Sequence, residues 1–139
     1  MTDTLAWTAR VLFPANERAP FVGRRLISTM LMAWGYAQQV DLAELVVCEL
    51  VSNAVRYAGD AGDLELEVIA DDQLIRLSIA DGSDERPVLN TSSPGQPGGM
   101  GLQLVDRVAT RWGVQDHLLG KRVWVELPAQ PAAVSAGGS

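Results

Sequence analysis

The chain of 139 residues has one cysteine, one histidine and no apolar run of the roughly 18 residues that a membrane span requires. With Cys48 as its only cysteine, the chain excludes an internal disulfide and a CxxC metal site. With His117 as its only histidine, it excludes a metal site built from several histidines. The first ten residues lack the basic and then apolar pattern of a secretion signal. These absences predict a cytoplasmic protein with no membrane contact.

Basic residues are also scarce. Acidic residues number 17 against 11 basic ones, for a net charge of −6, and the only adjacent basic pairs are Arg24-Arg25 and Lys121-Arg122. No basic stripe with interleaved aromatic residues is present, which argues against direct nucleic-acid binding. The apolar fraction of 47% is ordinary for a globular protein, and the length predicts one domain.

The apolar periodicity predicts an α+β fold. Helical spacing is expected over 19–34, ending at Gly35, over a second segment capped by Asp41 and running to about Tyr57, and over 100–110. Alternating residues predict strands at 7–13, 64–68, 74–80, 112–116 and 122–127. This order predicts a mixed, mostly antiparallel sheet with helices on one face. The expected domain spans 7–127, with disordered ends at 1–6 and 128–139.

The second predicted helix carries Glu49 and Asn53 one turn apart, in an otherwise apolar segment. A helical wheel places the apolar side chains on one side and the polar ones on the other: Val47, Leu50, Val51 and Ala54 against Glu49, Ser52, Asn53 and Arg56. The polar group is either the solvated stripe of a surface helix or the wall of a pocket.

Asp81 follows a strand in which Ile75, Leu77 and Ile79 alternate with other residues. The period of two puts Asp81 in phase with these three side chains, so its carboxylate is expected to face the apolar layer. A carboxylate in that position requires a partner. Alternatively, Asp81 simply begins a turn with Gly82-Ser83.

A third feature is the glycine cluster in Pro97–Leu102, directly before a predicted helix. Glycines allow the backbone to approach a ligand closely, and the free N–H groups of a first helical turn attract anions. The cluster is not a Rossmann motif, because no strand precedes it directly. Gly120-Lys121 is not a P-loop either, because Arg122 follows where serine or threonine is required.

Taken in order, the three features can surround one nucleotide. Asn53 can offer its side-chain oxygen to Mg²⁺, and Glu49 can accept a proton from an attacking hydroxyl. Asp81 can accept a hydrogen bond from the exocyclic amine of adenine. The amides of Gly98–Gly101 can hold the phosphates.

These motifs resemble those of a known superfamily. Glu49-x-x-x-Asn53-Ala54, Asp81-Gly82-Ser83 and Gly99-Met100-Gly101-Leu102 look like the N, G1 and G2 boxes of the gyrase, histidine-kinase and MutL ATPases. The similarity covers about Val11 to Leu127 and is greatest to anti-sigma-factor serine kinases and small actinobacterial ATP-binding regulatory proteins. It implies a two-layer α/β sandwich of the Bergerat type with a lid at about 83–98. Glu49 is the implied catalytic residue and Asn53 the implied metal ligand. The implied ATP-binding residues are Asn53, Arg56, Asp81, Gly82, Ser83, Gly98, Gly99, Met100, Gly101 and Leu102.

The resemblance implies ATP and Mg²⁺ as cofactors and protein serine/threonine kinase activity. The γ-phosphate would pass to a serine of an antagonist protein, and the homodimeric kinase would bind a sigma factor. One alternative is an ATP-dependent switch with little or no kinase activity, and another is a detached histidine-kinase domain. Ser83 replaces the second glycine of the G1 box, and Arg86 is the only basic residue of the lid. Arg56 and Arg107 are therefore the candidates to contact the γ-phosphate. The first helix, with Phe21, Arg24, Arg25 and Met30, is either a partner surface or core with solvated arginines.

Overall fold

The computed structural model describes residues 6–58, 62–81, 100–117 and 120–131, without the side chains at 57, 58, 100–102 and 117. Its elements are β1 (Trp7–Pro14), α1 (Ala19–Trp34), the 3-10 helix η1 (Ala37–Gln39), α2 (Val40–Ala58), β2 (Asp63–Ala70), β3 (Leu74–Asp81), α3 (Met100–Val108), β4 (Arg111–His117) and β5 (Gly120–Pro128). The described strands form one five-stranded sheet in the order β1-β2-β3-β5-β4. Every neighbouring pair is antiparallel, so the α+β prediction is confirmed and the described sheet contains no parallel pair.

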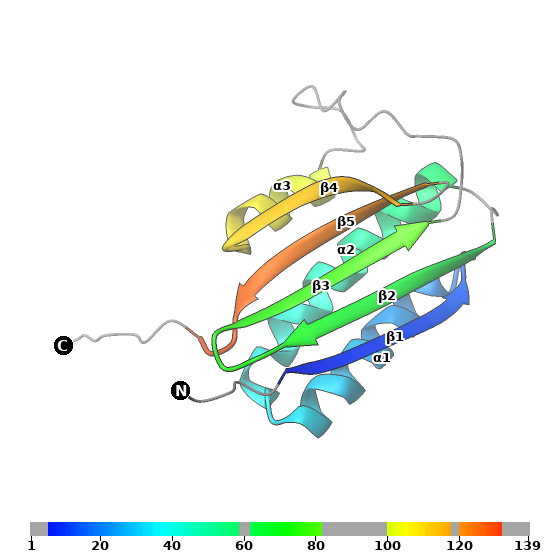
Figure 1. Cartoon of the computed structure of the whole chain (residues 1–139). Helices are drawn as coiled ribbons and strands as arrows, with labels where there is room; N and C mark the ends of the chain where they lie inside the picture. The colour runs from blue at the N-terminus through cyan, green and yellow to red at the C-terminus, as the bar shows by residue number, and fades with distance from the viewer. Residues whose placement is uncertain (1–5, 59–61, 82–99, 118–119, 132–139) are drawn as a thin grey trace.

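The helices form a single layer against one face of the sheet (Figure 1). α1 packs along α2, α2 packs against β3, and α3 packs against α2. Gly23 permits the close approach of α1 to α2, because a Cβ there would lie 3.0 Å from Val47 Cγ1 and 3.1 Å from Val51 Cγ2. α1 ends where the sequence predicts, at Gly35, whose φ of 91° is readily adopted only by glycine.

The sheet face under the helices is apolar because every second strand residue points to it. In β3 the residues that do so include Ile75, Leu77 and Ile79, each 0–2% exposed. The facing side of α2 contributes buried apolar residues at helical spacing: Ala43, Val46, Val47, Leu50, Val51 and Ala54. The predicted apolar side of this helix is thus confirmed, and the main core lies between α2 and β3.

The opposite face carries a network of charges in place of a second helix layer. Arg122 donates to Ser78 Oγ at 2.8 Å and pairs with Glu65. Glu126 pairs with Arg111 at 3.0 Å and with Arg76 at 3.4 Å, and the Arg76 guanidinium lies 4.3 Å from the centre of the Trp124 ring. These contacts link β2, β3, β5 and β4 across the sheet, so the network keeps this face polar and the domain two layers thick.

Two predicted boundaries differ from the structure. Asp41 does not cap α2 but lies inside its first turn, because η1 precedes the helix and α2 already begins at Val40. There the Asp41 carboxylate faces the positive end of the helix dipole. Pro128 ends β5, and the buried Ala129 donates its N–H to the Gln73 carbonyl at 3.0 Å. Both residues belong to the packed domain, although the sequence places them in the tail.

No helix in the described ranges is long and apolar enough to span a bilayer.

Candidate nucleotide-binding site

Asn53 is a buried amide whose oxygen lacks a partner. Its side chain is 4% exposed, and Oδ1 has no hydrogen bond within the described residues. Leaving a buried polar atom unpaired costs about 1–3 kcal/mol. Asn53 follows Leu50 by one turn in α2, so it is held at the edge of the sheet-facing side. The buried orientation excludes the solvated-stripe interpretation for this residue and leaves an acceptor available to a ligand.

Glu49 lies one helical turn before Asn53 and is partly buried. Within the part of the chain that the structure describes, its carboxylate forms no ion pair or hydrogen bond. A carboxylate that is partly shielded from water but not committed to a structural partner can accept a proton. Glu49 and Asn53 therefore present two oxygen acceptors from neighbouring turns of one helix.

Asp81 ends β3 and is 4% exposed, so the inward orientation predicted from the strand period is confirmed. Its partner is Lys121, whose Nζ lies 3.3 Å from Asp81 Oδ2 and whose side chain is 5% exposed. Ala80 pairs with Arg122 in the β3–β5 ladder, so Asp81 and Lys121 occupy the next positions along the two strands. The ion pair supplies the partner that a buried carboxylate requires.

Lys121 is a residue that the sequence interpretation missed as part of the site. In the sequence, Gly120-Lys121 is considered only as a P-loop and is rejected because Arg122 follows it. A signal was available, because Lys121 is in phase with the inward-facing residues Val123 and Val125 of β5. A single cation in that apolar series requires an anion on the inner face.

The fold brings these groups to one end of the molecule. Figure 1 shows the last turns of α2 near the end of β3 and the beginning of β5. α2 packs against β3, and α3 packs against α2. Asn53, Asp81 and Lys121 thus come from three elements that share one end of the sandwich. Together they offer an amide oxygen, a carboxylate and an ammonium group.

The other predicted site residues are only partly described. Arg56 and Arg107, the candidates for the γ-phosphate, are both exposed. Met100, Gly101 and Leu102 form the beginning of α3, so a helix N-terminus is present where the sequence predicts one. Gly82, Ser83, Gly98, Gly99 and the predicted lid at 83–98 lie outside the described residues.

The donor set suits a hard cation that is bound mainly by phosphate and water. The described residues contain no group of three or more His, Cys, Asp or Glu side chains that could hold a metal by themselves. Mg²⁺ typically keeps several waters and takes one or two protein oxygens besides the substrate phosphates. The unpartnered Asn53 Oδ1 fits that role, since it is buried and its hydrogen-bonding capacity is unused.

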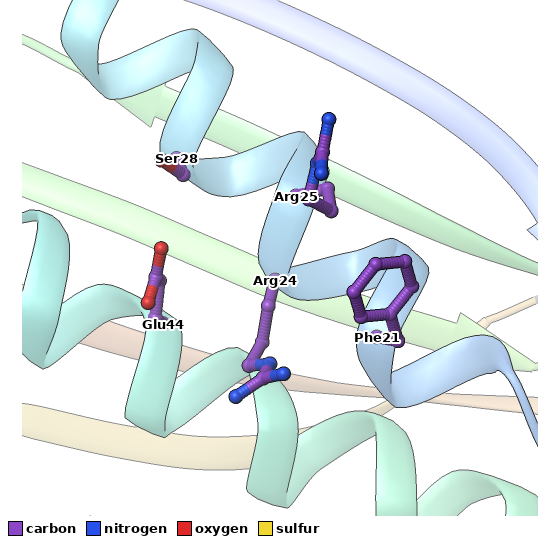
Figure 2. A pocket seen from close by; sticks show the side chains of 5 residues that line it. All are labelled: Phe21, Arg24, Arg25, Ser28 and Glu44. Atoms are coloured by element: carbon purple, nitrogen blue, oxygen red, sulfur yellow. The ribbon is translucent and has the colours of Figure 1, made fainter.

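A hollow lies on the outer side of the helix layer, between α1 and α2. Phe21, Arg24, Arg25, Ser28 and Glu44 line this pocket of about 190 Å³ (Figure 2). The Phe21 ring is 45% exposed, with the guanidinium groups of Arg18 and Arg25 each 5.8 Å from its centre. Both Arg24 and Arg25 are exposed, while Met30 packs against the core.

A two-layer sandwich with an antiparallel sheet and polar groups at the end of one central strand is compatible with a nucleotide-binding domain. The family model for histidine kinase-, DNA gyrase B- and HSP90-like ATPases matches residues 38–131, which is more than half of the chain. The chain belongs to this family. Domains of the family bind ATP, usually with Mg²⁺. No curated protein matches the chain significantly.

Proposed function

We propose that the protein is an ATP-binding regulator that transfers the γ-phosphate of ATP to a serine of an antagonist protein and binds a sigma factor. The observation that carries the proposal is the buried Asn53 oxygen without a partner, on the same helix as an uncommitted Glu49. A structural amide would have its oxygen paired, whereas a Mg²⁺ ligand needs that oxygen available. The motif resemblance to anti-sigma-factor serine kinases supplies the substrate and partner classes.

Glu49 is the proposed general base. Transfer to a serine requires removal of the hydroxyl proton as the oxygen attacks phosphorus, and a positioned carboxylate performs this step in other phosphoryl transfers. Bound Mg²⁺ would neutralise charge on the phosphate oxygens. Asn53 would hold that ion, so the base and the metal ligand act one helical turn apart.

A second candidate is a switch that binds ATP but transfers little phosphate. Two observations favour this switch: Arg86 is the only basic residue of the predicted lid, and both arginines that are candidates to contact the γ-phosphate are exposed. ATP would then only select a conformation that binds the partner.

We further propose that partner proteins contact the outer side of α1. Arg18, Arg24 and Arg25 are exposed there beside the exposed Phe21, although the whole chain is acidic. The first turn of α1 contains no acidic residue, so the positive end of its dipole adds to the arginine charge. An acidic segment with an apolar side chain is the complementary partner.

The experiment that tests the kinase proposal measures ATP binding and phosphate transfer separately. The full chain is incubated with radiolabelled ATP, Mg²⁺ and small antagonist-like proteins, and phosphoserine is sought, while calorimetry measures ATP affinity. Glu49→Gln should lower the transfer rate about 100-fold or more, since general-base catalysis contributes roughly 10²–10⁴-fold. Its ATP affinity should stay unchanged. Asn53→Ala should lose the Mg²⁺-dependent part of ATP affinity.

Asp41→Asn is the matched control, because it neutralises an exposed carboxylate of the same helix. It should leave binding and transfer unchanged. Undiminished transfer in Glu49→Gln would remove Glu49 as the base. Tight Mg²⁺-dependent ATP binding by the wild type with no phosphoserine on any candidate would favour the switch.

A further inference from the structure

We propose that Lys121 and Asp81 together recognise the adenine base of ATP, each through one hydrogen bond. The inference rests on the ATP binding contained in the proposed function and adds a specificity-determining residue to it. It starts from the ion pair at the inner ends of β3 and β5, in which Nζ and Oδ2 are 3.3 Å apart.

The position of this pair on the inner face is unusual for the molecule. The other ion pairs among the described residues of β3 and β5 lie on the outer face, where Arg122 pairs with Glu65 and Glu126 pairs with Arg76 and Arg111. Lys121 precedes Arg122 directly and points to the opposite face. Two well-packed apolar residues would stabilise the inner face at least as well as a buried ion pair does. A role in ligand binding would account for charges at this position.

Their place in the fold supports a role in nucleotide binding. Asp81 ends β3, and Lys121 is the second residue of β5, so both lie at the end of the sheet where α2 carries Asn53. A carboxylate only accepts hydrogen bonds, and an ammonium group only donates them. The pair therefore presents one acceptor and one donor side by side at the end of the core.

Adenine has the complementary pattern. Its exocyclic amine donates, and the ring nitrogens on either side of that amine, N1 and N7, accept. With the amine on Asp81, the Lys121 ammonium can donate to one of these two nitrogens. Guanine carries an accepting oxygen at the position of the amine, and that oxygen would face the Asp81 carboxylate. The pair should therefore favour adenine over guanine in this orientation.

The test compares ATP analogues that lack a single acceptor. Calorimetry with the wild-type chain and Mg²⁺ measures the affinity of ATP, 1-deaza-ATP, 7-deaza-ATP, GTP and base-free inorganic triphosphate. One of the two deaza analogues should bind about 10- to 100-fold more weakly than ATP, because a hydrogen bond from a charged donor has that effect. GTP should bind more weakly as well. In Lys121→Met, which has no hydrogen-bond donor at this position, the difference between ATP and the affected deaza analogue should fall to about two-fold or less.

A purely structural Lys121 predicts a different result. Its substitution would weaken the binding of inorganic triphosphate as much as the binding of ATP. The ratio of the affinities for ATP and deaza-ATP would stay unchanged. The Asp81→Leu/Lys121→Met double variant, which replaces the ion pair by two apolar side chains, repeats the measurement if the single variant does not fold. Arg122→Gln is the matched control, since it changes the neighbouring cation on the outer face and should keep the wild-type ratios.

Each outcome decides between the two proposals. ATP and both deaza analogues binding the wild type within about two-fold of one another would overturn the role of Lys121 and leave ATP binding intact. Equal affinity for ATP and GTP would do the same. No measurable affinity of the wild type for any of these nucleotides would overturn the proposed function and, with it, this inference.

Discussion

Two equally buried amides stand at opposite ends of the second helix, and their surroundings differ. Gln39, just before α2, and Asn53, in its second half, are each 4% exposed. Gln39 Nε2 donates to the Pro128 carbonyl at 2.7 Å, whereas Asn53 Oδ1 has no partner among the described residues. Burial alone therefore does not separate a structural amide from a ligand-binding one. The two kinds of amide differ in whether their polar atoms already have hydrogen-bond partners within the protein.

The same contrast extends to the surroundings of each amide. Near Gln39, the Tyr36 hydroxyl donates to the Asp71 carbonyl at 2.9 Å, and Ala129 donates to Gln73 at 3.0 Å. These bonds join η1, the β2–β3 turn and the end of β5. We call this the closed end because its buried amide is hydrogen-bonded within the protein, although Tyr36, Asp72 and Ala129 line a surface pocket there. The described polar side chains at the end of the sandwich that holds Asn53 include the buried Asp81–Lys121 pair and the uncommitted Glu49. At one end of the sandwich the buried Gln39 amide is hydrogen-bonded within the protein. At the other end, Asn53 Oδ1 and the Glu49 carboxylate are available as acceptors for a ligand.

The largest change is expected from Lys121→Met, which removes the ammonium beside Asp81. The Asp81 carboxylate would lose its ammonium partner in the core, and breaking a buried pair in this way lowers the free energy of unfolding by about 3–5 kcal/mol. Urea unfolding of the chain without nucleotide measures the loss. The Asp81→Leu/Lys121→Met double variant should recover most of it, since two apolar residues need no partner. A double variant that is as unstable as the single one would show that the charges themselves hold this end together.

The central comparison predicts opposite behaviour for the two amides. Gln39→Ala leaves the Pro128 carbonyl without its donor, so the free energy of unfolding should fall by about 1–3 kcal/mol. Asn53→Ala removes an atom that is already unpaired, so it should change stability by less than about 1 kcal/mol. With Mg²⁺-ATP at about 100 times its dissociation constant, the wild type and Gln39→Ala should each gain about 2.7 kcal/mol, and Asn53→Ala should gain little. Equal losses of stability in the two variants would remove the distinction between the ends.

The sequence predicts the elements well because their signals are local. The bounds of α1 follow from apolar spacing and Gly35, and the inward side of Asp81 follows from the strand period. Gln39 shows where such reasoning stops. Its hydrogen bond joins residues 89 apart in the chain, and nothing in the neighbouring residues indicates that contact. Lys121 is an intermediate case. The alternation of residues in β5 places its side chain on the inner face, but its pairing with Asp81 depends on β3 and β5 being neighbours in the sheet.

The smallest expected effect lies in the closed end and concerns Asp71 in the β2–β3 turn. Its Oδ1 accepts the Leu74 and Gln73 N–H groups at 2.9 and 2.8 Å, and these bonds hold the pKa of the carboxyl below the ordinary value of 3.8. A pKa that is lower in the folded than in the unfolded chain adds stability above about pH 4, which is lost as pH falls through the folded value.

Because the site is open to solvent, Asp71→Asn should lower the free energy of unfolding by about 1 kcal/mol or less at pH 6. Below pH 4 the difference from the wild type should shrink toward zero, as measured by urea unfolding across this range. Asp72→Asn, at the exposed neighbouring residue, is the control and should show no such convergence. A difference that persists unchanged at low pH would mean that the shape of the Asp71 side chain, and not its charge, holds the closed end.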